Sequence, residues 1–152
     1  SLEFPLAKVT ALDISGAAIK IAKMNSINLG CQIEFIQSFW LESLVGTFDL
    51  IVCNPPYISY SEYLALDCMV KNHEPREALI PDMNESCTGY ENYFYFSTRI
   101  KNFLNKGGFA LFEVGAGKAP FVEMCFKRID GTFVQSHKDI DGRERVVSVL
   151  NM

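Results

Sequence analysis

Apolar and polar residues alternate along the first third of the chain in a way that predicts two strands and a helix. Apolar runs at residues 8–13 and 33–37 are short and bounded by polar residues, which is typical of strands. Between them, residues 16–29 carry apolar positions at helical spacing, with Ser15 placed to cap the start and Gly30 placed to end the helix. A strand–helix–strand order of this kind favours an α/β fold.

The rest of the chain continues this alternation around one long irregular segment. The continuous apolar run at residues 48–53 predicts a strand buried on both faces, as in a parallel sheet. Residues 58–89 lose the pattern, which predicts a long loop with one short helix near 62–70, and a connection of this length is usually functional. Further helices are expected over 90–104 and 119–128, and strands over 109–114, 132–137 and 145–150, with turns at 105–108 and 138–143. We therefore expect residues 1–152 to form one domain whose sheet ends in an antiparallel pair.

Composition narrows the classes of protein that fit this pattern. The chain has 152 residues and a net charge of −4, so it lacks the overall positive field of a tight nucleic-acid binder. Its five cysteines are scattered and its two histidines are far apart, so we expect no metal site, core roles for the thiols and a reducing, cytoplasmic setting. No apolar run reaches the roughly 18 residues of a membrane span, so no membrane association is expected.

The chemistry is predicted where two strands end, because ligands of open α/β sheets bind beyond the carboxyl ends of the strands. Asp13 ends the first strand, and Asn54, Pro55, Pro56 and Tyr57 follow the third. The prolines fix the backbone and carry no N–H, so nearby carbonyls are stiff acceptors, while Asn54 offers an acceptor and two donors and Tyr57 a flat face. These four residues, the tetrad, could grip a planar amide or amino group. They would orient its nitrogen toward an electrophile. No base is required if that electrophile is a sulfonium methyl, and the rate would then be gained from positioning and electrostatics.

Several stretches together resemble one enzyme family. Besides Asn54–Ile58 they include residues 11–15, 73–79, 107–109 with 113–115, and 138–147. In combination they resemble the HemK/PrmC family, which uses S-adenosylmethionine to methylate the glutamine of the Gly-Gly-Gln motif in peptide chain release factors. The resemblance implies a Rossmann-like class I methyltransferase sheet, release factors as the protein partner and a cytoplasmic enzyme. The tetrad alone would also fit nucleic-acid adenine methyltransferases.

The resemblance also implies roles for individual residues at the cofactor. Asp13 would accept hydrogen bonds from the ribose hydroxyls, with Ile14 beside it. Phe39 stands where the family usually has an acid, which removes the expected acceptor for the adenine amino group. Trp40 would lie near the adenine or pack in the core, and both interpretations stay open.

Asn54 has two implied roles: the resemblance implies that it binds the glutamine amide of the substrate and that it also contacts the cofactor. Pro55, Pro56 and Tyr57 would shape the slot around that amide.

The family's glycine-rich cofactor loop has no counterpart before Asp13. Only twelve residues precede Asp13, and none is glycine. In this class of enzyme the missing strand lies between the strands that end here at Asp13 and Cys53. We therefore expect a methyltransferase sheet truncated at its N-terminus, a C-terminal part of a longer enzyme, with poor cofactor binding by the chain alone.

Two alternatives follow from the same residues. Residues 113–118 (EVGAGK) resemble an acidic-x-Gly-x-Gly cofactor loop, as in circularly permuted nucleic-acid amino-methyltransferases. The acidic charge and the match at 138–147 disfavour this alternative, and a simple turn after a strand is preferred. The second alternative is an inactive fragment of a split or decayed gene, which the missing glycine loop and Phe39 would suit.

Overall fold

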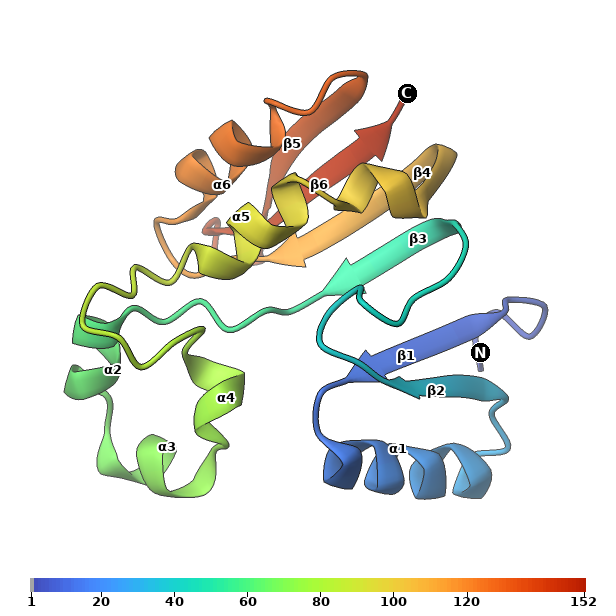
Figure 1. Cartoon of the computed structure of the whole chain (residues 1–152), viewed down its shortest axis with the longest axis horizontal. Coiled ribbons are helices and arrows are strands. Elements are labelled where there is room, and N and C mark those ends of the chain that lie inside the picture. Colours follow the sequence, from blue (N-terminus) through green and yellow to red (C-terminus); the bar gives the residue numbers. More distant parts are fainter. Residues whose placement is uncertain (1) are drawn as a thin grey trace. The chain divides into compact units, whose positions relative to one another are not determined.

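The computed structural model describes residues 2–152 and divides them into two compact units. The first unit ends at Gly46, and the second runs from Thr47 to Met152. Each unit has a sheet of its own, with two strands in the first unit and four in the second (Figure 1).

The first unit is a strand, a helix and a parallel strand. β1 (Val9–Asp13) pairs in parallel with β2 (Ile33–Gln37), and α1 (Gly16–Asn28) connects them. α1 begins where predicted, because the Ser15 hydroxyl accepts a hydrogen bond from the Ala18 N–H at 3.2 Å and so caps the first turn. The strand–helix–strand prediction is therefore confirmed nearly residue for residue.

The second unit contains a four-stranded sheet in the order β3-β4-β6-β5. β3 (Phe48–Cys53) lies parallel to β4 (Leu104–Glu113), and β6 (Glu144–Asn151) runs antiparallel to both β4 and β5 (Thr132–Lys138). The predicted turn at 105–108 is instead an irregularity within β4. Phe48 is opposite Leu104 and Leu50 is opposite Phe109, so four residues of β4 lie opposite one residue of β3. The antiparallel pair at the end of the chain is confirmed.

Two helices cover one face of this sheet and create its aromatic core. α5 (Glu91–Ser97) and α6 (Ala119–Phe126) contribute Phe96 and Phe126, which pack against Phe112 of β4. The ring centroids lie 5.0 Å apart for Phe96–Phe112 and 4.7 Å apart for Phe112–Phe126, and all three side chains are fully buried. Contacts of this kind are the main source of stability in the second unit.

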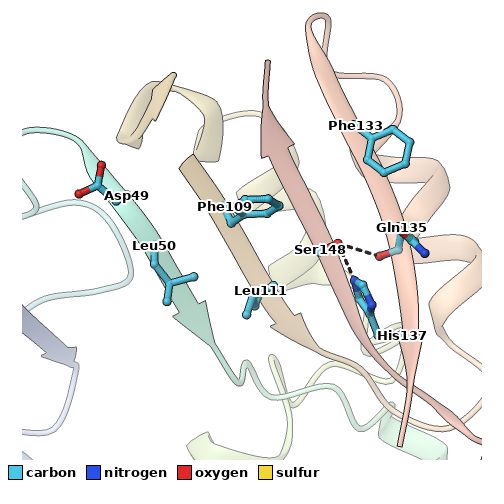
Figure 2. A pocket seen from close by; sticks show the side chains of 8 residues that line it. All are labelled: Asp49, Leu50, Phe109, Leu111, Phe133, Gln135, His137 and Ser148. Carbon is cyan, nitrogen blue, oxygen red and sulfur yellow. Dashed lines mark hydrogen bonds between the residues drawn. The ribbon is translucent and has the colours of Figure 1, made fainter. Parts of the chain in front are cut away.

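The opposite face of the sheet is exposed, which corrects the prediction that residues 48–53 are buried on both sides. Leu50 and Val52 are 56% and 71% exposed, and Phe133 on β5 is 54% exposed. Figure 2 shows this face, where Leu50 projects from β3, Phe109 from β4 and Phe133 from β5. The apolar run predicted the strand correctly, but within the second unit helices cover only the face that carries Phe112.

The segment after the tetrad also differs from prediction. Instead of one helix near 62–70 it forms α2 (Tyr60–Ala65), α3 (Cys68–His73) and α4 (Arg76–Leu79). Local caps explain the interruptions: Ser59 and Glu62 form a capping box, the Asp67 carboxylate accepts from the Met69 N–H, and Pro75 precedes α4.

The helix predicted over 90–104 is likewise broken. α5 ends at Ser97, and a short 3₁₀ helix, η1 (Ile100–Phe103), leads into β4. The Ser97 and Thr98 hydroxyls donate to the carbonyls of Phe94 and Tyr95, and such back-bonding competes with a continuing helix. None of the helices among residues 2–152 is long and apolar enough to cross a membrane.

Candidate functional site

The tetrad follows the carboxyl end of β3, and contacts within the second unit hold its backbone in place. Pro55 is fully buried. The Pro56 carbonyl accepts a hydrogen bond from the side-chain amide of Asn92, at 3.0 Å, and Asn92 itself is buried on α5. Asn54, in contrast, is exposed, and no described residue hydrogen-bonds to its side-chain amide. The structure therefore presents the Asn54 amide to solvent from a fixed backbone.

Tyr57 packs closely against the backbone at two glycines, Gly89 and Gly115. A Cβ atom at Gly115 would lie 2.9 Å from Cδ2 of the Tyr57 ring, and a Cβ at Gly89 would lie 2.3 Å from the Tyr57 carbonyl oxygen. The Tyr57 hydroxyl donates to Oε1 of Glu113 at 3.4 Å. Partial burial and the Glu113 carboxylate raise the pKa of Tyr57, so the phenol stays protonated at neutral pH and acts as a donor. The contacts with Gly89, Gly115 and Glu113 thus fix the position of Tyr57.

The contact at Gly115 helps to decide whether residues 113–118 form a cofactor loop or a simple turn. Gly115 leaves room for the ring of Tyr57 and for the Lys118 stem, so its missing side chain is explained by packing within the second unit. This favours the simple-turn interpretation over a permuted cofactor loop.

The close approach at Gly89 supports a stability prediction. We expect Gly89→Ala to lower the free energy of unfolding by about 2 kcal/mol or more, because φ is +80° there and the new Cβ would collide with the Tyr57 carbonyl. Gly107→Ala is the matched control, since φ is +78° but nothing lies within 4 Å, and we expect about 1 kcal/mol. Urea unfolding followed by circular dichroism measures both. Equal losses in the two variants would show that the contact with Tyr57 contributes nothing.

Four of the five residues expected at the cofactor belong to the first unit, and the fifth, Asn54, belongs to the second. Because β1 and β2 are parallel and Asp13 is opposite Gln37, Asp13 and Ile14 lie at the same sheet end as Phe39 and Trp40. Oδ1 of Asp13 accepts from the Ser15 N–H at 2.7 Å, so one carboxylate oxygen organises the turn into α1. The carboxylate is nevertheless exposed, as its proposed role requires.

Phe39, which is exposed, and Trp40, which is partly buried, form an aromatic pair at this end. Their ring centroids lie 6.3 Å apart, and Phe39 is 47% exposed. Trp40 has φ +46°, a left-handed conformation that is rare for a bulky residue and is a common mark of functional sites. The roles of these residues stay predictions.

Two features of the site were not predicted from the sequence. Asn92 bonds to a carbonyl 36 residues earlier in the chain, and nothing in the local pattern indicates that contact. Gly89 was part of the long loop, where a lone glycine before a helix was its only signal. Within residues 2–152, no group of three or more His, Cys, Asp or Glu side chains is placed to hold a metal ion.

The sequence of the chain is similar to those of known methyltransferases. The profile of the "Methyltransferase small domain" family matches residues 1–75. A "Bifunctional methyltransferase" of Rickettsia typhi is 37% identical over 97% of the chain and 28% of its own length. A "Release factor glutamine methyltransferase" of Synechocystis is 38% identical over 98% of the chain and 50% of its own length. These matches support the HemK/PrmC-type methyltransferase family for this chain. It spans about half the length of the release factor methyltransferases it matches, and less of the bifunctional ones.

The fold agrees with this family. A solved methyltransferase from Pyrococcus furiosus superposes with a TM-score of 0.69 at 15% identity, covering 99% of the chain and 67% of the solved one. The architecture is that of a Rossmann-like class I methyltransferase. The methyl donor of such enzymes is S-adenosylmethionine.

Proposed function

We propose that this chain supplies the amide-binding part of an S-adenosylmethionine-dependent methyltransferase. Its substrate is the glutamine side-chain amide in the Gly-Gly-Gln motif of peptide chain release factors, in the cytoplasm. The observation that carries the proposal is the tetrad: an exposed Asn54 amide on a backbone fixed by buried Pro55 and by the bond from Asn92 to the Pro56 carbonyl.

The tetrad can orient an amide without a catalytic base. The two N–H groups of the substrate amide would donate to Oδ1 of Asn54 and to the Pro55 carbonyl, with the Tyr57 ring limiting the slot. Holding both hydrogens directs the nitrogen toward the methyl carbon of the donor. When bound, S-adenosylmethionine would supply the methyl group and would keep the electron pair of its sulfur–methyl bond. The tetrad would hold the amide nitrogen that takes the methyl group, and the extra proton on that nitrogen would pass to water. The protein's contribution is positioning and a fixed polar environment.

The first unit fits the methyl donor in part. The exposed Asp13 carboxylate suits ribose hydroxyls, and Ile14, Phe39 and Trp40 offer apolar surface at the same sheet end. Phe39 cannot accept a hydrogen bond from the adenine amino group, so that contact is missing at this position. The proposal accordingly includes weak cofactor binding.

Charge supports a polypeptide rather than a nucleic acid as substrate. Residues 58–90, which follow the tetrad directly, contain six acidic and two basic residues, whereas the rest of the chain contains twelve of each. The whole net negative charge therefore lies in the segment beside the slot. Such a segment repels a phosphate backbone and attracts a basic polypeptide surface.

A labelling experiment tests the proposed function. The purified chain is incubated with tritiated S-adenosylmethionine at millimolar concentration, to offset weak binding, and with a release factor, its Gly-Gly-Gln glutamine→alanine variant, DNA or RNA. We expect label only in the release factor that has the glutamine. Label in nucleic acid would favour the adenine methyltransferase alternative, and no label in any substrate would favour the inactive fragment.

A further inference from the structure

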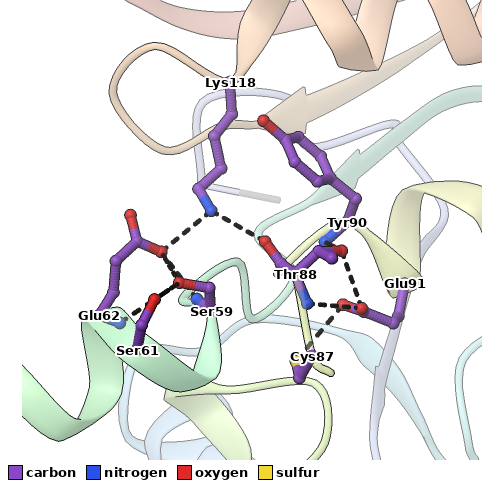
Figure 3. A network of polar contacts seen from close by, with 8 residues as sticks. All are labelled: Ser59, Ser61, Glu62, Cys87, Thr88, Tyr90, Glu91 and Lys118. Atoms are coloured by element: carbon purple, nitrogen blue, oxygen red, sulfur yellow. Dashed lines mark hydrogen bonds and ion pairs between the residues drawn. The ribbon is translucent and has the colours of Figure 1, made fainter. Parts of the chain in front are cut away.

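Lys118 is a buried lysine at the centre of a polar network that the tetrad chemistry does not use. It follows β4 and directly precedes α6, and it is only 8% exposed. Its Nζ donates to Oε2 of Glu62 at 3.1 Å and to the Thr88 carbonyl at 3.3 Å, and it lies 5.0 Å from the centroid of the Tyr90 ring. Figure 3 shows the ammonium group between Glu62 and Thr88, which come from the two ends of the segment that follows the tetrad.

Each partner of Lys118 is itself fixed. Glu62 accepts hydrogen bonds from the Ser59 N–H and hydroxyl, both at 2.7 Å. Partial burial raises the pKa of Glu62, but the bonds from Ser59 and Lys118 outweigh it, so the pKa lies below its usual value and the carboxylate stays charged. At the other end, the Thr88 N–H and hydroxyl donate to Oε1 of Glu91 at 2.8 and 2.9 Å.

The network lies directly against the tetrad. A Cβ at Gly89 would be 2.8 Å from Nζ of Lys118 and 2.3 Å from the Tyr57 carbonyl oxygen, so both groups converge on one glycine. The segment is otherwise joined across its own ends by the Ile58 N–H bond to the Leu79 carbonyl and the Tyr60 N–H bond to the Cys87 carbonyl. Its three helices are short and have no buried residues, so little apolar packing holds them.

We infer that Lys118 is a positioning residue: its ammonium group fixes residues 58–91 against the Tyr57 end of the tetrad. Through that segment it sets the affinity for the polypeptide around the target amide. The second half of this inference rests on the proposed function, whereas the first half concerns the chain alone. Burial costs the lysine its hydration. The hydrogen bonds to Glu62 and Thr88 offset that cost, and they join the two ends of a segment whose helices have no buried residues.

Hydrogen exchange on the full chain tests the first half. We expect Lys118→Met, which keeps the aliphatic stem and removes the charge, to speed exchange of the Ile58 and Tyr60 amides about tenfold. Exchange of the Phe112 amide in the core strand β4 should stay unchanged. Lys127→Met is the control, because Lys127 pairs with Glu123 on α6 far along the chain from this segment, and it should leave all three amides unaffected. Unchanged exchange at Ile58 and Tyr60, or an equal rise at Phe112, would overturn the inference.

Direct titration of a release factor tests the second half without requiring methyl transfer. We expect Lys118→Met to weaken binding about tenfold, Lys118→Arg to restore part of the affinity because a cationic donor is kept, and Lys127→Met to have no effect. If turnover can be measured, KM for the release factor should rise while kcat is retained. Equal affinity for the wild type and Lys118→Met overturns this half, whereas absence of methyl transfer with the expected binding difference contradicts only the proposed function.

Discussion

Replacing Asn54 by alanine will lower methyl transfer by about two to three orders of magnitude, comparable to removing one preorganised polar group from an active site. The reason is that the Asn54 amide is the exposed polar group of the tetrad, and alanine leaves one substrate N–H without an acceptor. Stability should change by no more than about 0.5 kcal/mol, because no described residue hydrogen-bonds to this side chain. The labelling assay and urea unfolding measure the two effects.

Two further variants make the result specific. Asn72→Ala removes an exposed asparagine of α3 within the neighbouring segment and should keep full transfer. Asn54→Asp keeps the acceptor oxygen but replaces the amide NH₂ by a second acceptor oxygen and adds a negative charge, so we expect a rate between those of the wild type and the alanine variant. If Asn54→Ala transfers methyl groups within a few-fold of the wild type, the tetrad does not bind the reacting amide.

The position of the tetrad could be predicted because it depends on local pattern. An apolar run followed by two prolines must end a strand, and a strand end is where an α/β sheet binds ligands. The structure confirms that β3 ends at Cys53, immediately before Asn54. What holds the tetrad could not be predicted, since Asn92 reaches Pro56, and Lys118 reaches Glu62, across 36 and 56 residues of sequence.

Asp13 illustrates a different limit. The sequence allows this acid either to cap the turn into a helix or to bind a ribose, and the structure shows the first role through its bond to the Ser15 N–H. The two roles are compatible because a carboxylate has two oxygens and several acceptor positions. Oδ1 of Asp13 caps the turn, and Oδ2 is the oxygen left to accept from a ribose hydroxyl.

Burial of the strands was the least predictable feature, because it depends on which elements cover each face. The run Phe48–Cys53 has an apolar pattern on both faces, yet Leu50 and Val52 are exposed whereas Phe112 on the neighbouring strand is fully buried. Alternation within a strand separates its two faces, but the helices that cover one face come from residues 91–97 and 119–126.

The difference between the buried and the exposed face of this sheet predicts the largest effect of a substitution on stability. Phe112→Ala will lower the free energy of unfolding by about 3–5 kcal/mol, because its ring fills the space between Phe96 and Phe126 and a cavity would remain. Phe133→Ala is the matched control on the exposed face of the same sheet, and we expect a loss of about 1 kcal/mol or less. Urea unfolding followed by circular dichroism compares the two.

Phe112 also supports the strand that precedes the tetrad, so we expect Phe112→Ala to weaken substrate binding as well as stability. In the register of β3 with β4, Phe112 is opposite Cys53, the residue before Asn54. Loosening this pair removes support from the strand end that presents the tetrad, and we expect release factor binding to weaken in Phe112→Ala at temperatures where the variant is still folded. Phe133, on β5 at the far edge of the sheet from β3, should leave that binding unchanged. Equal stability losses, or equal losses of binding, in the two variants would show that the buried aromatic face does not support the tetrad.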